Sequence, residues 1–499
     1  MGSFDLYITG LSNIDFGIIA ILLLGTISGV LVGALPGLTA TMAIAVMVPL
    51  TYSMSPEMAF ALLMGVFCGA MYGGAIPAVL ANIPGTPSAI MTALDGYPMG
   101  QKGEGGKAIG IATIASFIGG IISVVILTVF APMLASFALE FSAQEYFAVS
   151  LLGLSIVAFI SSGTLTKGLL SAAIGLMLAT IGMDPIMGFE RFTFGNVQLM
   201  GGLELIPVMV GLFGLGTVLS SLHSDANKDG PKEVKTQVGR IIPTWKDFKS
   251  NIPPIFRGSL IGSFVGAIPA AGGTIAGIMA YGIEKRVSKH SEKFGTGIPQ
   301  GVAAPESANN ATSGSSLIPM LTLGIPGDAI TAILMGALIM HGLQPGPLLF
   351  ENQPDFVSTL FIMIVIANFI FLFFGLFGAK VVSKIMMIPS GVLLPIILMF
   401  CVVGTFSLRN NIFDVGVLIV FGILGFIFYK VNVPTAPLVL GFILGPLLET
   451  NFRRTLILSD GNITEIFTRG ISGSIMIIAL LILFAPLLIK FIKNIILKK

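Results

Sequence analysis

Long apolar segments separated by short polar ones run along almost the whole chain. Segments with no charge or a single one recur at residues 16–35, 108–139, 203–222, 356–379, 385–408, 412–429 and 470–489. Because the hydrocarbon core of a bilayer is crossed by a helix of about 20 apolar residues, these segments predict membrane-spanning helices. Including shorter segments, we expect about 10–14 membrane passes or partial passes. The two-residue alternation of an outer-membrane strand is absent. The pattern therefore predicts an all-α polytopic membrane protein.

The composition agrees with lipid as the main solvent of the chain. Hydrophobic residues make up 55% and charged residues 10%, and the mean hydropathy is +0.97. Soluble domains carry about 25% charged residues. The N-terminus contains Asp5 and no basic residue, so it does not fit a cleavable signal peptide, and the first apolar segment is expected to remain as a span.

The remaining composition excludes several classes of protein. Cys68 and Cys401 lie in separate apolar segments, and we expect buried packing residues rather than a disulfide. No cysteine–histidine cluster suggests a structural zinc. A formal net charge of +2 without a soluble basic domain gives no sign of nucleic-acid binding.

Two motifs rich in glycine and proline occur twice, in the same order. Residues 29–46 read GVLVGALPGLTATMAIAV and residues 262–279 read GSFVGAIPAAGGTIAGIM, with identical residues 233 positions apart (262 − 29). Residues 75–85 and 317–327 share two prolines that lie 242 positions apart (319 − 77). The order and spacing predict an internal duplication. We expect the two repeats to be inverted, each with a Gly/Pro-broken re-entrant hairpin.

Charge separates the two expected repeats. Residues 222–257 hold seven Lys/Arg against four Asp/Glu and are predicted to be a basic cytoplasmic connection between a first transmembrane repeat, 1–221, and a second, 258–499. Residues 284–293 carry four more Lys/Arg. If both flanks of 258–283 are cytoplasmic, this segment forms a re-entrant hairpin with its tip near the midplane; a single broken span is the alternative.

The broken segments are candidate binding sites. Gly/Pro-interrupted hydrophobic segments at corresponding positions of two repeats point to the site of a secondary transporter. Helix N-termini suit carboxylates, and free carbonyl groups at helix ends suit cations. We therefore expect residues 36–41, PGLTAT, and 269–274, PAAGGT, to form paired tips. Kinks that only permit close helix packing are the alternative.

A polar stretch follows the second tip. Residues 305–316 read PESANNATSGSS and contain eight polar residues, which would be costly at membrane depth without a ligand-binding environment. Glu306 is expected to bind a cation, to take up a proton or to cap a helix that begins near Ser307. The amides of Asn309 and Asn310 can both donate to a carboxylate and coordinate sodium.

Residues 81–110 are expected to present similar chemistry in the first repeat. The predicted substrate-binding residues are Pro36, Gly37, Thr39, Thr41, Asn82, Gly85, Thr86, Pro269, Gly272, Gly273, Thr274, Asn309, Asn310, Ser313 and Gly327. The coupling-ion candidates are Thr274, Glu306, Asn309 and Asn310. Neither tip contains an arginine; Arg191, Arg409, Arg453 and Arg454 are expected in polar connections. Either backbone dipoles and hydroxyls recognise the substrate, or one of these arginines folds in.

Four stretches resemble the large membrane subunit of tripartite tricarboxylate transporters. They are GALPGLTATMAIAVMVPLTY, GAIPAAGGTIAGIMAYGIEKR, FGTGIPQGVAAPESANNATSGSSLIPMLTLGIPGD and ALIMHGLQPGPLLF, and the similarity covers approximately residues 16–450. The second tip departs from the family pattern, since it reads PAAGGT where the family more often has Pro-Gly-Ala-Gly-Ala-Thr. This departure bears on the choice of substrate or ion.

The resemblance implies a multi-pass permease of the bacterial inner membrane, not an enzyme. It implies uptake of citrate or another carboxylate, driven by a Na+ or H+ gradient without ATP or any other cofactor. The partners it implies are a small membrane subunit and a periplasmic substrate-binding protein. A transporter or channel that acts without a binding protein is the alternative. An intramembrane enzyme is not indicated, because His223, His290 and His341 fall in loops or at helix ends.

Overall fold

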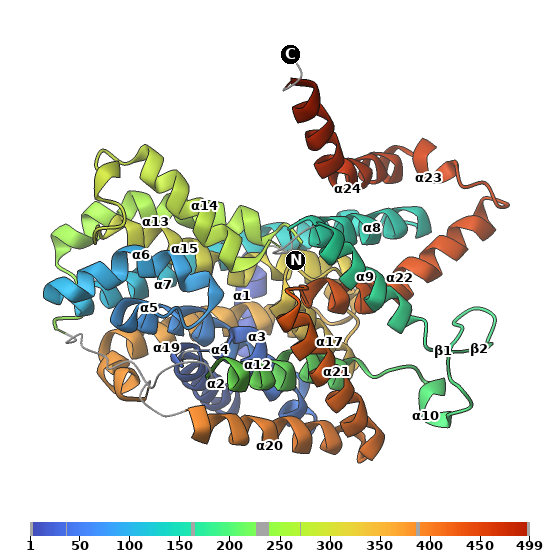
Figure 1. Cartoon of the computed structure of the whole chain (residues 1–499), viewed down its shortest axis with the longest axis horizontal. Coiled ribbons are helices and arrows are strands. Elements are labelled where there is room, and N and C mark those ends of the chain that lie inside the picture. Colours follow the sequence, from blue (N-terminus) through green and yellow to red (C-terminus); the bar gives the residue numbers. More distant parts are fainter. Residues whose placement is uncertain are drawn as a thin grey trace.

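The computed structural model describes residues 3–35, 37–160, 165–225, 239–269, 271–385 and 390–496 (Figure 1). Most of this part is helical, and the strands within it are the two-residue β1 and β2, paired antiparallel with Gly182 opposite Arg191. Most helices pack around one large apolar core that includes Phe60, Tyr72 and Phe371. The prediction of an all-α polytopic fold is confirmed. Cys68 and Cys401 are both free and buried, as expected.

The elements follow one another along the chain with these bounds. The first half contains α1 (Ser3–Ser12), α2 (Phe16–Ala34), α3 (Ala40–Met47), η1 (Val48–Thr51), α4 (Pro56–Gly73), α5 (Ala75–Ala81), η2 (Pro87–Ala89), α6 (Ile90–Met99), η3 (Gly100–Glu104), α7 (Gly105–Ala138), α8 (Ala143–Ile160), α9 (Leu165–Ala179), β1 (Gly182–Met183), β2 (Glu190–Arg191), α10 (Val197–Met200), α11 (Leu205–Met209), η4 (Val210–Leu215) and α12 (Gly216–Asp225). The second half contains α13 (Trp245–Gly266), α14 (Gly272–Val287), η5 (Ser291–Lys293), α15 (Gln300–Ser315), α16 (Leu317–Leu323), α17 (Ala329–Met340), α18 (Leu348–Asn352), α19 (Pro354–Ile385), α20 (Ser390–Arg409), α21 (Ile412–Lys430), α22 (Ala436–Leu458), α23 (Glu465–Thr468) and α24 (Gly470–Ile496).

Helices of membrane-spanning length account for much of the described chain. Seven helical segments of that part are long and apolar enough to cross a bilayer: Phe16–Ala34, Pro56–Ala81, Pro87–Ala138, Leu205–His223, Pro354–Lys384, Gly391–Arg409 and Ile412–Lys430. Four shorter apolar helices lie at Ala40–Thr51, Leu165–Ala179, Ala329–Met340 and Gly470–Phe484. The expected 10–14 passes included partial ones, and the division between full and partial passes stays a prediction.

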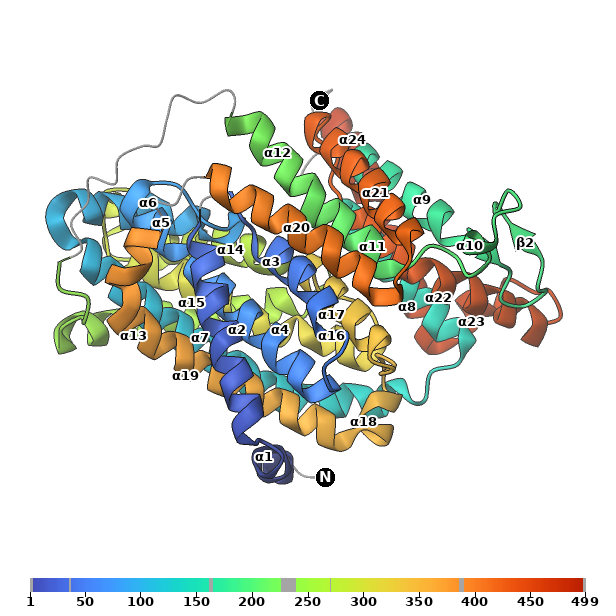
Figure 2. The ribbon, with the colours of Figure 1, turned by 90° about the horizontal axis from the view of Figure 1, so that it is seen from below.

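Two helix pairs are packed in the same way. Helix α2 lies along α4, as Figure 2 shows, and α13 lies along α15. In each pair, a glycine on every fourth residue of the first helix faces the backbone of the second, so that an added Cβ would collide with it. The contacts are Gly25–Leu62, Gly29–Val66 and Gly33–Ala70 in one pair, and Gly258–Ala304, Gly262–Ala308 and Gly266–Thr312 in the other.

These contacts keep the spacing of the repeated motifs. Corresponding glycines lie 233 positions apart (258 − 25), and their partners lie 242 positions apart (304 − 62). The next element is also similar: α5 and α16 each have seven residues. They end at left-handed residues, Asn82 with φ 57° and Gly324 with φ 68°. Glycine and asparagine adopt this conformation most readily. The predicted repeat boundaries and the inverted orientation stay predictions.

Helices α13 and α14 fold back on each other as a hairpin. Arg257 lies nine residues before the end of α13 (266 − 257), and Glu284 lies twelve residues after the start of α14 (284 − 272). The Arg257 side chain nevertheless donates from Nε and Nη2 to the Glu284 carboxylate, at 2.8 and 2.7 Å. Two side chains this far from the turn between their helices can meet only if the helices run antiparallel. The hairpin agrees with the expected return of the chain, and the depth of its tip in the membrane stays a prediction.

The basic connection expected at 222–257 is partly helical. Helix α12 extends to Asp225 and α13 already begins at Trp245. A capping box explains this start, because Thr244 Oγ1 accepts from the Asp247 N–H and Asp247 accepts from the Thr244 N–H. Residues 226–238 of the connection lie outside the described residues.

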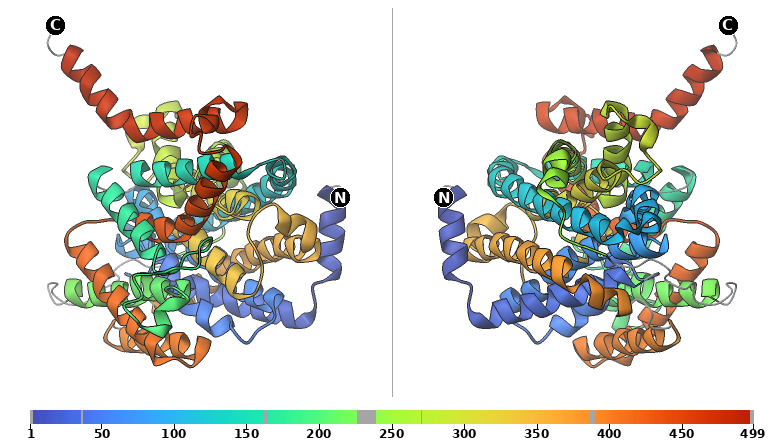
Figure 3. Two further views of the ribbon diagram at one scale, coloured as in Figure 1. Left: turned by 90° about the vertical axis from the view of Figure 1, so that its right-hand side faces the viewer. Right: turned by 90° about the vertical axis from the view of Figure 1, so that its left-hand side faces the viewer.

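A peripheral group of helices lies beside this core. Helix α22 packs against α8 and α9, and α24 packs against α8. In Figure 3, α24 extends away from the other helices toward the C-terminus. The short β1–β2 hairpin follows α9 on the same side of the molecule (Figure 1).

Candidate functional site

The polar stretch of residues 305–316 is a buried helix. It belongs to α15 and the junction with α16, where Glu306, Ser307, Asn309, Asn310, Thr312, Ser313, Ser315 and Ser316 are all at most 2% exposed. Helices α7, α13, α14 and α6 surround it. A helix with so many buried polar groups needs a partner for each of them.

Most of the hydroxyl groups are satisfied within α15 itself. Ser307, Thr312 and Ser313 donate to carbonyl oxygens three residues earlier, at 3.0, 2.6 and 2.6 Å. Ser315 donates to the Ala311 carbonyl at 2.9 Å. Such bonds let a hydroxyl be buried without a ligand. Ser313, which we predicted to bind substrate, therefore has a structural partner.

Glu306 is bound by hydroxyl groups from two neighbouring helices. Thr92 on α6 donates to Oε1 at 2.5 Å, and Ser116 on α7 donates to Oε2 at 3.1 Å. Asn310 adds a third link, because its Nδ2 donates to Ser116 Oγ at 2.8 Å. Among the ion pairs of the described residues, none includes Glu306. The proposed capping role is wrong, since α15 begins at Gln300, six residues before Glu306 (306 − 300).

Asn309 has one satisfied and one unsatisfied polar atom. Its Nδ2 donates to the Met71 carbonyl on α4 at 3.1 Å, whereas its Oδ1 is buried and has no hydrogen-bond partner within the described chain. This oxygen points toward the start of α14, where a Cβ added to Gly273 would lie 2.5 Å from it. The same Cβ would lie 3.2 Å from Thr312 Oγ1. A buried amide oxygen left unpaired is costly, which makes this position a candidate ligand site.

The second tip is a glycine turn rather than a proline-started helix. Helix α14 begins at Gly272, whose φ is +59°, so Pro269 lies three residues before the helix and not at its first position. Pro269 and Thr274 are both half-buried. Ala270 lies outside the described residues. The first N–H groups of α14 are those of Gly272, Gly273 and Thr274, and the first-turn N–H groups of a helix suit an anion or another ligand.

The first tip begins its helix at a threonine. Thr39 is the N-cap of α3, and its Oγ1 accepts from the Met42 N–H at 3.1 Å. Gly37 is exposed and has φ +89°, and Thr41 is half-buried. Pro36, which we expected at the helix start, lies outside the described residues. The helix end in this tip is accordingly at Thr39.

The loop of the first repeat contributes mainly structural groups. Asn82 is exposed and ends α5. Gly85 is packed against the backbone of Gly33 and Gly74, and Gly327 is packed in the corresponding way against Ser316. Thr86 is buried, with its Oγ1 3.0 Å from Ser88 Oγ. These contacts account for the two glycines without a ligand.

One carboxylate near the second tip was missed by the sequence analysis. Asp328 is 8% exposed and caps α17, with Oδ1 accepting from the Thr331 N–H at 2.8 Å. A Cβ added to Gly272 would lie 4.0 Å from Asp328 Oδ2. The signal was present, because Asp328 directly follows Gly327 in an apolar region, and buried acidic residues in membrane segments are candidates for function.

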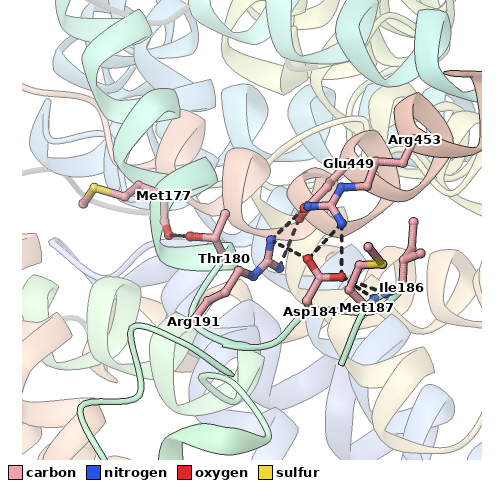
Figure 4. A network of polar contacts seen from close by, with 8 residues as sticks. All are labelled: Met177, Thr180, Asp184, Ile186, Met187, Arg191, Glu449 and Arg453. Carbon is pink, nitrogen blue, oxygen red and sulfur yellow. Dashed lines mark hydrogen bonds and ion pairs between the residues drawn. The ribbon is translucent and has the colours of Figure 1, made fainter. Parts of the chain in front are cut away.

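Three of the four arginines that we considered as substrate clamps, Arg191, Arg409 and Arg453, are paired with carboxylates. Figure 4 shows Arg191 and Arg453 around Asp184 and Glu449, with Arg191–Glu449 at 2.7 Å and Arg453–Asp184 at 2.8 Å. The N–H groups of Met187 and Ile186, together with Arg453, lower the pKa of Asp184 to about 2. Arg453 and Arg454 lie within α22. The expectation that they lie in a polar connection is wrong.

Arg409 lines a cavity that could hold a small ligand. This cavity of about 270 Å³ also includes Tyr52, Glu204 and Asp414. Arg409 bonds both carboxylates, at 2.6 Å to Glu204 and 2.6 Å to Asp414. Two negative groups around one guanidinium leave no positive charge for an anion.

The fold and the buried polar centre define a class: a multi-pass α-helical membrane protein in which broken helices bring polar groups into an apolar interior, as in secondary transporters. The model of the tripartite tricarboxylate transporter TctA family matches residues 19–440, and the chain belongs to this family. The family is one of transporters, not enzymes.

Two relatives from Agrobacterium vitis are similar over different lengths. An uncharacterized 52.8 kDa protein in the TAR-I ttuC' 3'region is 39% identical over 459 residues, covering 91% of this chain and 90% of the relative. An uncharacterized protein in the TAR-II ttuC' 3'region is 40% identical over 227 residues, covering 46% of this chain and 94% of the relative. No solved structure matches the chain.

Proposed function

We propose that the protein is the permease subunit of a tripartite system that moves citrate or a related carboxylate across the bacterial inner membrane. Its partners would be a small membrane subunit and a periplasmic substrate-binding protein, and a Na+ or H+ gradient would drive the transport. Membership of the TctA family, over residues 19–440, supports this assignment.

The observation that carries the proposal is the unpaired Oδ1 of Asn309. This oxygen is buried beside the first residues of α14, where it faces Gly273. An acceptor held in this place by the bond from Nδ2 to Met71 is ready to coordinate a cation or to accept from a ligand. A bound cation or hydrogen-bond donor would remove the cost of leaving this oxygen unpaired.

Backbone N–H groups and threonine hydroxyls would bind the substrate carboxylate. The N-termini of α3 and α14 carry partial positive charge. Thr39 is the N-cap of α3, and Thr41 and Thr274 lie in the first turns of α3 and α14. The described arginines with ion pairs are engaged elsewhere. Transport would follow from movement of one repeat against the other around these tips, as in other repeat-built secondary transporters.

The test is uptake of radiolabelled citrate by proteoliposomes that contain the permease and the small membrane subunit, with the binding protein added outside. Sodium is titrated at fixed pH, and the proton gradient is varied separately. We expect uptake that saturates with substrate and stops when both gradients are collapsed with ionophores. Uptake that continues without either gradient would rule out the proposal. Equal uptake with and without the binding protein would instead favour a stand-alone transporter.

A further inference from the structure

The two tips differ in charge. At the second tip, Asp328 follows the Gly327 turn, and the residue at the matching position of the first repeat is Thr86 (328 − 242 = 86). Thr86 has a neutral hydroxyl paired with Ser88. A carboxylate therefore lies beside the second tip, and the matching position of the first repeat carries a neutral hydroxyl.

The Asp328 carboxylate has a fixed position. The Asp328–Thr331 capping box holds Oδ1 against the Thr331 N–H and hydroxyl, at 2.8 and 2.9 Å. The side chain also lies next to Gly272, since a Cβ at that residue would be 3.5 Å from Asp328 Cβ. Among the ion pairs of the described residues, none involves Asp328. A buried carboxylate without a cationic side chain is costly unless another group balances its charge.

A second observation points to a ligand at the next residue of α14. The unpaired Oδ1 of Asn309 faces Gly273, which is the residue after Gly272. Thr312 Oγ1 lies on the same side of Gly273, and its hydrogen is donated to the Asn309 carbonyl at 2.6 Å, so its lone pairs remain available. Carboxylate, amide and hydroxyl oxygens are the ligands of hard cations.

We propose that Asp328 is a ligand of a sodium site at the second tip, together with Asn309 Oδ1 and Thr312 Oγ1. This inference rests on the proposed gradient-driven transport and assigns the cation to one tip. The negative charge of Asp328 attracts Na+ and repels a carboxylate. The substrate carboxylate would then be bound chiefly at the N-terminus of α3, and the N-terminus of α14 would be left to the cation site, because the position that matches Asp328 in the first repeat is the neutral Thr86.

The competing explanation is that Asp328 serves only as a helix cap. Its charge would then be balanced by the N-termini of α17 and α14, which both lie beside it. Two variants separate these roles. Asp328→Asn removes the charge but keeps a good capping residue. Thr331→Ala removes half of the capping box and keeps the carboxylate.

The experiment measures thermal unfolding of the purified full-length protein as choline chloride is replaced by NaCl at constant ionic strength, without substrate. We expect a saturable rise in Tm for the wild type, because a ligand that binds only the folded state stabilises it. The sodium midpoint is the Na+ concentration that gives half of the maximal rise in Tm. Asp328→Asn and Asn309→Ala should each raise this midpoint at least tenfold. Thr331→Ala should lower Tm in choline and shift the midpoint much less than Asp328→Asn, because the Thr331 N–H still holds Asp328 Oδ1.

Three results would overturn the site. They are a wild-type Tm that does not respond to sodium, an Asp328→Asn midpoint equal to that of the wild type, and a Thr331→Ala midpoint shifted as far as that of Asp328→Asn. Failure of the proposed function looks different. Sodium binding as expected, combined with citrate uptake that needs no gradient, would remove the function and leave the site. Sodium-driven uptake with normal sodium binding by Asp328→Asn would remove the site and leave the function.

Discussion

The helix pairs α2–α4 and α13–α15 share a backbone arrangement and differ in chemistry. Glycines in the same register let each pair approach closely. In α4 the buried positions include Met64 and Phe67, whereas the positions 242 residues later in α15 are Glu306 and Asn309. Backbone packing therefore depends on the glycines, and the side chains on the second helix decide whether a pair is apolar support or a polar centre.

The largest effect is expected from filling the glycine contacts. Gly29→Leu and Gly262→Leu would each push a side chain into the backbone of Val66 or Ala308. We expect each to destabilise the fold by about 3 kcal/mol or more, because both helices would have to separate. Yield of monodisperse protein in size-exclusion chromatography and Tm measure this loss.

The control for this prediction is Gly282→Ala on α14. A Cβ at Gly282 meets no heavy atom within 4 Å, and alanine favours a helix by about 1 kcal/mol over glycine. This variant should be as stable as the wild type or more so. If Gly29→Leu were harmless and Gly262→Leu were not, the two pairs would not share one packing.

The next largest effect distinguishes α15, which carries the polar centre, from the apolar helix α4. Asn309→Ala should lower citrate uptake at least a hundredfold with protein still in the membrane, because it removes the oxygen that faces Gly273. Phe67→Ala at the matching position should destabilise the fold by about 3–5 kcal/mol by leaving a cavity. Its uptake per folded molecule should stay near that of the wild type. Uptake normalised to folded protein distinguishes the two, and wild-type uptake by Asn309→Ala would move the site elsewhere.

A smaller contrast is expected at the next pair of positions. Glu306→Leu removes the acceptor for Thr92 and Ser116 and leaves their hydroxyls buried, which costs about 1–3 kcal/mol. Met64→Leu is close to conserving volume and should cost less than about 1.5 kcal/mol. Thermal unfolding of both variants measures the difference. Equal Tm values would show that Glu306 is not needed for the stability of the polar centre.

The smallest effect is expected outside both pairs, in the network of Figure 4. Because the folded pKa of Asp184 is about 2, below its ordinary value of 3.8, the charged form stabilises the folded hairpin. This contribution is present above about pH 4 and is lost as the pH falls toward 2. Asp184→Asn should speed pepsin cleavage near residues 182–191 at pH 5.

Two measurements serve as controls for Asp184→Asn: pepsin cleavage at pH 2 and citrate uptake. At pH 2 the two proteins should be cleaved at more similar rates than at pH 5, since about half of the folded Asp184 carboxylate is then protonated. Citrate uptake should be unchanged, because the network lies away from the tips. An equal difference between the two proteins at both pH values would assign the effect to something other than this charge.

Local patterns predicted several features of the structure. The breaks at Gly272 and before Thr39 follow from glycine and proline, and the burial of residues 305–316 follows from their place in an apolar chain. Other expectations were wrong. Glu306 does not cap a helix, and Pro269 does not begin one. Helix bounds depend on which residue caps the first turn, and proline alone does not identify it.

The sequence by itself determined that the chain is a helical membrane protein, where its helices break and which motifs occur twice, because apolar length and glycine or proline act locally. Only the tertiary structure decided which polar groups are paired. It joined Thr92 and Ser116 to Glu306, and it placed Asp328 and the unpaired Asn309 oxygen beside adjacent glycines. These partners come from helices far apart in the chain, so their meeting depends on packing, which no local pattern contains.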